Sequence, residues 1–322
     1  MNKKLIMALV ATLIVLPLSA KSAEANTTQA PTIAIIDTAL DTSLSLFKDR
    51  IAYEVCIVEF DVCPNGKPIM EGPGSAVIPA DLMQKLKLEH GTQMASLAVK
   101  TNMTVKIVFI RIQGIDSRTK LAKPRGNKTV DMALDWIIAN QSKFNIQAVS
   151  MSQSAYNVTR PTFPFYMTAA GTDYCPKYPA TDQKVNQLVS MGVPSFFPTG
   201  NNADQSRIAW PACIPSSIAI GAVYDYGSVA EYSNRDNKLV DFYAQGNNMA
   251  LGPNNQLTGT NGTSGATVIA ATSWATIKSI KPGLTYTQIY DLIGSTSKPS
   301  NALVAGKVVS IGKTIDLVKA TQ

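Results

Sequence analysis

Three side chains in the sequence, Asp37, His90 and Ser264, are of the types that together perform nucleophilic catalysis. A neutral imidazole can take the proton of a serine hydroxyl, and a carboxylate can hold that imidazole in the required orientation. Each residue alone also fits a structural role, because aspartate often follows a strand, serine often caps a helix and a lone histidine is often structural. The interpretation therefore depends on the segments in which the three residues occur.

Those segments place the three residues, together with Asn201, where chemistry can take place. Asp37 directly follows the apolar run 32–36, and ligands of open α/β sheets gather at the carboxyl ends of the strands. His90 opens a helical segment of small residues. Ser264 heads another, whose backbone N–H groups could stabilise a developing oxyanion. Asn201 follows a further apolar run, and its amide could donate to that oxyanion, although Gly-Asn-Asn is also an ordinary turn.

Short β-branched apolar runs alternate with helical patterns along the chain, which predicts a mostly parallel sheet with helices on both faces. The expected strands span residues 32–36, 105–110, 148–151, 193–197 and 217–223. The expected helices span residues 91–100, 130–140, 183–191 and 286–293. A further helix after Ser264 is apolar almost all round and is expected to be buried. The predicted fold class is α/β, a three-layer αβα sandwich.

The first 25 residues are predicted to be a signal peptide. Lys3 and Lys4 precede an apolar run from Leu5 to Leu18, and Ala23-Glu24-Ala25 is a small-x-small cleavage site. An apolar run of this length is too short to span a bilayer comfortably, so it is not interpreted as a membrane anchor. The mature protein is expected to be exported, either secreted or periplasmic, with no membrane span.

Residues 26–322 are expected to form a single domain with a sizeable core. No internal repeat or low-complexity linker divides them. The net charge of +7 is scattered over the sequence without a Lys/Arg run, so we do not expect a nucleic-acid partner. A monomer is expected.

The four cysteines, Cys56, Cys63, Cys175 and Cys213, predict disulfides, since an even number in an exported chain is typical of them. Three pairings are possible. We favour Cys56 with Cys63 and Cys175 with Cys213, because the first pair encloses a short stretch beside a turn and the second would tie segments that flank the site. A metal role is not expected, because His90 is the only histidine and no C-x-x-C spacing occurs.

Four sequence blocks resemble those of the subtilase family, the subtilisin-like serine proteases. IAIIDTALD resembles its aspartate block, EHGTQMAS its histidine block, FPTGNN its oxyanion-asparagine block and NGTSGATVIAA its serine block. The order of aspartate, histidine and serine is also that of subtilisin. The intervening and closing segments resemble the family too, including IGKTIDLVKA as part of its closing helices. The resemblance covers residues 31–322.

This resemblance implies a secreted serine endopeptidase that forms an acyl-enzyme. Ser264 would attack the peptide carbonyl, and His90 would take its proton and later protonate the leaving amine. Asp37 would hold the imidazole tautomer. The Asn201 side chain and the Ser264 backbone N–H would form the oxyanion hole. No cofactor is required for this chemistry.

The resemblance also implies where a polypeptide substrate lies. It would run extended along Ser152, Gln153 and Ser154, adding a strand to the sheet edge. Ala209 would lie near the base of the pocket for the P1 side chain, which precedes the scissile bond. Because the family commonly has glycine at this position, we expect a shallow apolar pocket that prefers small or medium side chains.

Two features depart from the family pattern. Many subtilases carry a propeptide domain before the catalytic core, but only residues 26–36 separate the expected cleavage site from Asp37. Relatives often insert a calcium-binding loop after the histidine helix, and the segment 100–106 has no acidic insertion. We therefore expect no propeptide domain and do not predict that structural calcium site.

Two alternatives belong to other classes. An α/β-hydrolase esterase orders its triad serine, acid, histidine, but no histidine follows Ser264, so this alternative fails. A catalytically weak or inactive binding protein with the subtilase fold remains open, because the pattern of residues does not report the reactivity of Ser264.

Overall fold

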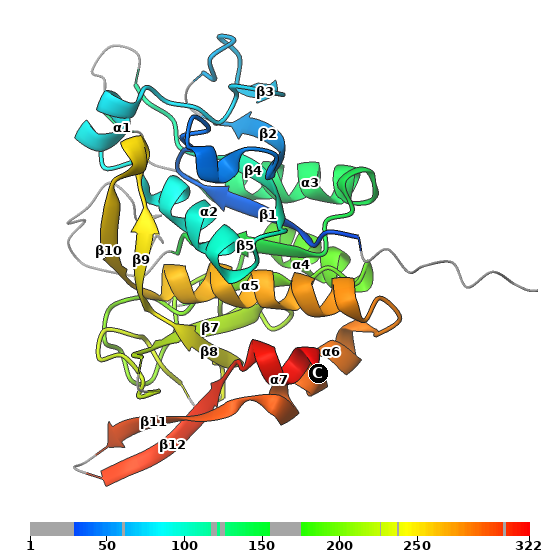
Figure 1. Cartoon of the computed structure of the whole chain (residues 1–322), viewed down its shortest axis with the longest axis vertical. Helices are drawn as coiled ribbons and strands as arrows, with labels where there is room; N and C mark the ends of the chain where they lie inside the picture. The colour runs from blue at the N-terminus through cyan, green and yellow to red at the C-terminus, as the bar shows by residue number, and fades with distance from the viewer. Residues whose placement is uncertain are drawn as a thin grey trace, which may run out of the picture.

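The computed structural model describes residues 29–59, 62–116, 121–122, 126–154, 175–225, 227–236, 238–304 and 307–322. The predicted signal peptide lies outside them. Within the described residues the strands form a ten-stranded sheet in the order β11-β12-β8-β7-β6-β5-β1-β4-β2-β3 (Figure 1). The strands are β1 (Thr32–Asp37), β2 (Ile51–Ile57), β3 (Ile69–Glu71), β4 (Lys106–Arg111), β5 (Ala148–Met151), β6 (Ser195–Pro198), β7 (Ile218–Val223), β8 (Phe242–Gln245), β11 (Lys298–Val304) and β12 (Lys307–Thr314).

The pairing from β12 through to β2 is parallel, and only the edge pairs β11–β12 and β2–β3 are antiparallel. A separate antiparallel ribbon joins β9 (Asn247–Leu251) and β10 (Leu257–Asn261). The prediction of a mostly parallel central sheet is confirmed.

Helices cover both faces of this sheet (Figure 1). On one face lie α2 (His90–Thr101), α5 (Thr263–Ile280), α6 (Tyr286–Thr296) and α7 (Leu317–Thr321), and on the other lie α3 (Asn127–Phe144) and α4 (Pro179–Ser190). A short helix, α1 (Ala80–Lys85), precedes α2. The molecule therefore has the three predicted layers.

The alternation of side chains in β1 explains why its sequence is apolar throughout. Ile33 and Ile35 point into the core beneath α2 and α5, whereas Ala34 and Ile36 point into the core beneath α3. A strand covered on both faces needs apolar residues at successive positions. The helix α5 is likewise buried along most of its length, as its composition predicts, with Trp274 fully buried against the sheet.

The sequence-based expectation was wrong for the last part of the sheet. The segment 311–314, expected to belong to the closing helices, forms the end of β12, and the final helix is confined to α7. Its hairpin partner β11 is an edge strand of the sheet. Pro299 is tolerated there because the outer side of an edge strand has no partner strand to accept a backbone N–H. Helical patterns cannot be read reliably from so short a segment when a neighbouring strand can pair with it.

Both favoured disulfides are present. Cys56 and Cys63 are bonded with an S–S distance of 2.06 Å, and Cys175 and Cys213 with 1.98 Å. The first closes a turn in which the Cys63 N–H donates to the Lys67 carbonyl at 2.7 Å. No helix in the described part of the chain is both long and apolar enough to cross a bilayer.

Candidate active site

The site lies at the carboxyl edge of the adjacent parallel strands β1, β5 and β6. Asp37 is the last residue of β1, Ser152 follows β5, and Asn201 lies three residues beyond β6. His90 is the first residue of α2 and Ser264 the second of α5. Two helix N-termini and three strand ends thus bring together residues that are up to 227 positions apart in the sequence.

Asp37 and His90 form a direct pair. The His90 Nδ1 lies 2.8 Å from Asp37 Oδ1 and 3.0 Å from Oδ2. The carboxylate is fully buried and also accepts the Thr38 N–H at 2.6 Å. The His90 side chain is 29% exposed, so one side of the ring is held in the protein and the other is open to a ligand.

Thr38 holds the start of α2 against the end of β1. Its hydroxyl donates to the Leu88 carbonyl at 2.7 Å and accepts the Gly91 N–H at 2.9 Å. The Gly91 α-carbon lies so close to the Ala39 backbone that a side chain there would collide with it. These contacts on either side of His90 set its distance from Asp37.

Ser264 reaches the same pocket but has a different hydrogen-bond partner. Its Oγ donates to the Ser152 carbonyl at 3.2 Å, and the Ser152 Oγ donates to the Ser264 carbonyl at 3.0 Å. Among the described residues no hydrogen bond joins the Ser264 hydroxyl to His90 in this conformation. Proton transfer to His90 therefore requires the hydroxyl to leave the Ser152 carbonyl.

Asn201 is fixed by contacts with the residue before Ser264. Its Oδ1 accepts both the backbone N–H and the hydroxyl of Thr263, each at 2.9 Å. This assignment leaves the Nδ2 group as the donor available to a ligand. The side chain is exposed in the pocket that also contains Ser264.

The loop that carries Asn201 is stabilised by Asn234, which the sequence did not single out. The fully buried Asn234 side chain accepts the N–H groups of Asn202 and Asp204 at 2.8 and 3.1 Å through Oδ1. Its own N–H donates to the Gly200 carbonyl at 2.9 Å. Gly200 has a φ of +104°, and a side chain on it would collide with the Asn234 amide. An asparagine 34 residues beyond Gly200 could be linked to this loop only by the fold.

A second residue whose contacts the sequence did not reveal is Gln153. It was expected to bind substrate, and it does line the pocket, but its side chain is buried and its Nε2 donates to Asp37 Oδ1 at 3.1 Å. Ser152 and Ser154 line the same pocket. Ala209 does not line it; it lies fully buried, and its N–H donates to the Thr199 carbonyl at 2.8 Å beside the Asn201 loop. Its role beneath a P1 side chain stays a prediction.

The pocket has a volume of about 280 Å³. It is lined by Lys87, Glu89, His90, Gln93, Ser152, Gln153, Ser154, Asn201, Thr260, Asn261 and Ser264. Among the described residues no group of three or more histidine, cysteine, aspartate or glutamate side chains could hold a metal ion. The donors and acceptors present fit acyl-transfer chemistry, with a base, a hydroxyl and an amide donor at one surface.

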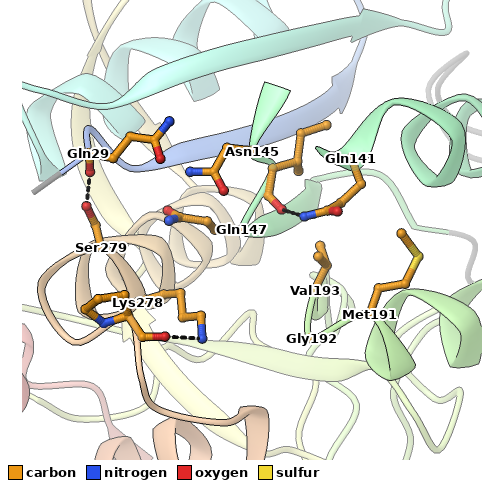
Figure 2. Close-up of a pocket in the computed structure, with 11 residues that line it drawn as sticks. Gln29, Gln141, Asn145, Gln147, Met191, Gly192, Val193, Lys278 and Ser279 are labelled. Atoms are coloured by element: carbon orange, nitrogen blue, oxygen red, sulfur yellow. Dashed lines mark hydrogen bonds between the residues drawn. The ribbon is translucent and has the colours of Figure 1, made fainter. Parts of the chain in front are cut away.

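A larger hollow of about 450 Å³ lies at the amino-terminal ends of the parallel strands, next to the C-terminal ends of α3, α4 and α5 (Figure 2). Its lining is mixed, and its amide side chains are those of Gln29, Gln141, Asn145 and Gln147. Its one cationic group, the Lys278 ammonium, donates to the carbonyls of Pro282 and Leu284 at 2.8 and 2.6 Å. No acid–base pair or activated nucleophile among the described residues faces this hollow, so the smaller pocket is the candidate active site.

A buried aspartate paired with a histidine, near a serine at a helix N-terminus and at the carboxyl ends of parallel strands, is an arrangement typical of serine hydrolases. The model of the subtilase family, Peptidase S8, matches residues 28–310. The chain therefore belongs to the subtilase family and is a serine-type endopeptidase. No curated protein sequence matches it significantly.

Solved structures of similar fold include proteases of several kinds. The prenylagaramide maturation protease PagA matches with a TM-score of 0.64 and 17% identity, covering 92% of this chain and 94% of that chain. A serine-to-alanine mutant of the protease domain of PatA matches with a TM-score of 0.65 and 16% identity, covering 90% of this chain and 93% of that chain. A cold-adapted subtilisin-like serine proteinase matches with a TM-score of 0.59 and 20% identity, covering 88% of this chain and 86% of that chain. At these identities the likeness concerns the fold alone.

Proposed function

We propose that the protein cleaves polypeptides through an acyl-enzyme on Ser264, with His90 as general base and Asp37 as its partner. The observation that carries this proposal is the 2.8 Å contact between His90 Nδ1 and the buried Asp37, in the pocket that also contains Ser264. Because Nδ1 donates to the carboxylate, the other ring nitrogen, Nε2, is left to accept the serine proton.

The step sequence follows from this tautomer. The Ser264 Oγ forms a bond to the scissile carbonyl carbon as its proton passes to His90 Nε2. The carbonyl oxygen becomes an oxyanion, which accepts hydrogen bonds from the Asn201 Nδ2 and from the N-terminal N–H of α5. Collapse breaks the C–N bond, and the imidazolium gives its proton to the leaving amine. Water then repeats the sequence to release the acid and restore Ser264.

In this proposal, substrate binding also breaks the hydrogen bond from the Ser264 hydroxyl to the Ser152 carbonyl. The Ser152 carbonyl, which accepts the Ser264 hydroxyl, lies on the segment 152–154 along which we propose that the substrate backbone pairs. A substrate N–H that donates to this carbonyl would displace the serine hydroxyl toward His90. We also propose a shallow P1 pocket for small or medium side chains near Ala209, a preference that a library of P1 variants measures.

The export of the protein is part of this proposal. Two disulfides, which persist in oxidising compartments, support it together with the signal-like first 25 residues. We further propose that the mature enzyme acts as a monomer and needs no metal or cofactor for the chemical step.

Hydrolysis of casein and of short peptides by the mature protein tests the proposal. The wild type should cleave and react with a fluorophosphonate probe, whereas Ser264→Ala should lose both, with kcat reduced by at least about 10⁴-fold. Ser295→Ala, which removes an exposed hydroxyl on α6, should behave as wild type. A folded wild-type protein that neither cleaves nor labels would instead favour an inactive subtilase-fold binding protein.

A further inference from the structure

We propose that Gln153 is a positioning residue that lowers the basicity of His90 by sharing the Asp37 carboxylate. The inference rests on the proposed function, because it assigns His90 as the general base. It goes further in giving the side chain of Gln153 a role in catalysis that differs from binding the substrate backbone.

Three N–H groups converge on one carboxylate oxygen. Asp37 Oδ1 lies 2.6 Å from the Thr38 N, 2.8 Å from His90 Nδ1 and 3.1 Å from Gln153 Nε2. The Gln153 Nε2 is also 3.4 Å from His90 Nδ1, so the amide lies against the Asp–His pair rather than behind it. Of the three donors, only Gln153 comes from the segment after β5, which is also the proposed substrate-binding segment.

Burial strengthens the contact between Gln153 and Asp37. Asp37 is fully buried and Gln153 is 6% exposed, so water competes little for either group. A donor that takes up part of the negative charge of the carboxylate leaves less of it to stabilise the imidazolium. The positive end of the amide dipole next to Nδ1 acts in the same direction. Both effects favour the neutral imidazole, the form that a general base needs.

Among the described residues, the charged groups that line the pocket come from segments other than 152–154. Lys87 and Glu89, in the loop before α2, line the same pocket, and the buried Glu89 Oε2 has no hydrogen-bond partner among the described residues. Asp41, further along the loop after β1, accepts hydrogen bonds from Ser43 and Asn254. The described pocket residues from β10 and α5 and at Asn201 are uncharged. All of these groups are unchanged by a substitution at Gln153.

The titration of His90 measures the effect directly. Since His90 is the only histidine in the chain, its imidazole resonances are assigned without ambiguity. We would titrate the mature protein by NMR in a Ser264→Ala background, which prevents self-digestion, and compare it with the same protein carrying Gln153→Met. Methionine keeps the length of the side chain and removes the donor. The titration midpoint should move to higher pH by about half a unit to one unit.

Gln93→Met is the matched control. Gln93 lies in α2 and lines the same pocket, but no described hydrogen bond joins its side chain to Asp37 or His90. This variant should leave the midpoint unchanged. In the active background, the acid limb of the kcat/KM profile should move with the NMR midpoint in Gln153→Met, so activity is lost mainly at low pH.

Gln153→Leu provides a second test if the methionine variant does not fold, and thermal unfolding checks both. A folded variant of either kind whose midpoint stays within about 0.1 pH unit of the parent would overturn the inference, as would a shift to lower pH. The NMR readout needs no turnover, so it stands even if the wild type proves inactive. An active wild type with no shift would refute the role of Gln153 and leave the proposed protease activity intact.

Discussion

At the scale of single residues, the orientation of the Asp–His pair is set before any substrate binds. The Asp37 carboxylate is buried, and it is held by donors from three different segments of the chain. A catalytic group whose rotamer is fixed by several contacts loses little entropy on reaching the transition state. In the proposed mechanism, the group that must still move is the Ser264 hydroxyl, which donates to the Ser152 carbonyl.

Asn201 has a structural contact with Thr263 and a proposed role as oxyanion donor, and substitution can separate the two. Asn201→Ala should lower kcat by roughly 10²–10³-fold, the size seen when one oxyanion-hole donor is removed from subtilisin, and should leave KM nearly unchanged. It should also destabilise the start of α5, because Asn201 Oδ1 accepts two hydrogen bonds from Thr263. Steady-state kinetics and urea unfolding measure the two effects.

Asn201→Asp is the control for this prediction. The carboxylate keeps both acceptor contacts with Thr263 but lacks the Nδ2 donor, so it should lose at least as much kcat while retaining the stability of the wild type. Full activity in Asn201→Asp would show that the amide donor does not contact the oxyanion.

The residues of the proposed triad could be picked out from the sequence because each lies in a distinctive local context, and their catalytic roles stay a prediction. The contacts of Gln153 and Asn234 could not be picked out in this way. Gln153 reaches Asp37 across 116 positions, and Asn234 reaches Asn202 across 32. Nothing in the local pattern of either residue distinguishes a buried amide that holds a catalytic group from an ordinary polar residue in a loop.

At the scale of secondary-structure elements, the loop after β6 depends on a residue from a distant segment. Asn234→Ala should leave the buried N–H groups of Asn202 and Asp204 without an acceptor. The loss should lower the free energy of unfolding by about 1–3 kcal/mol. Because Asn201 lies between Gly200 and Asn202, kcat should fall as well.

Asn234→Asp separates these effects, since its carboxylate keeps the Oδ1 acceptor for both N–H groups. It should retain more stability and more activity than Asn234→Ala. Equal activity in Asn234→Ala and wild type would show that the oxyanion loop keeps its geometry without this anchor.

How far the elements could be predicted depended on their burial. The strands β1, β4, β5, β6 and β7 are covered on both faces, and their apolar runs identified them. The ribbon β9–β10 was missed because β10 alternates between exposed and half-buried residues, and Ala250 is the only buried residue of β9. Strand β2, which lies between β4 and the edge strand β3, was missed because Tyr53 and Glu54 interrupt its apolar pattern.

At the scale of the whole molecule, the packed layers provide the stability of the fold, and the ends of the strands carry the polar groups of the site. Helices on both faces bury the sheet, and the strand ends at one edge are left to carry polar groups. The large hollow at the other edge has no comparable set of reactive groups among its described lining residues. Residues far from the active site therefore affect the enzyme mainly through the stability of this sandwich.

One partly buried contact should make the stability of the fold depend on pH. Asp241 precedes β8; its Oδ2 accepts the Ala219 N–H at 2.8 Å, and its Oδ1 accepts the Tyr290 hydroxyl at 2.6 Å. Burial raises the pKa of Asp241 above its ordinary value of 3.8, although both hydrogen bonds lower it in part. The folded protein thus binds this proton more tightly than the unfolded chain. The stabilisation is complete below about pH 3.8 and is lost as the pH rises through the raised pKa.

Tyr290→Phe should increase the stability that is lost as the pH rises through the pKa of Asp241. Burial and the neighbouring Asp241 raise the pKa of Tyr290, so its hydroxyl remains a donor at neutral pH. Its removal withdraws a hydrogen bond that favours the ionised carboxylate, which should cost about 1–2 kcal/mol at pH 7 for this half-buried pair and less near pH 4. Tyr286→Phe, which alters a ring one turn earlier on α6 and stacked on Tyr290, should give a penalty that is nearly independent of pH. Urea unfolding of the three proteins at both pH values measures the difference, and a constant penalty in Tyr290→Phe would mean that the hydroxyl does not stabilise the charge on Asp241.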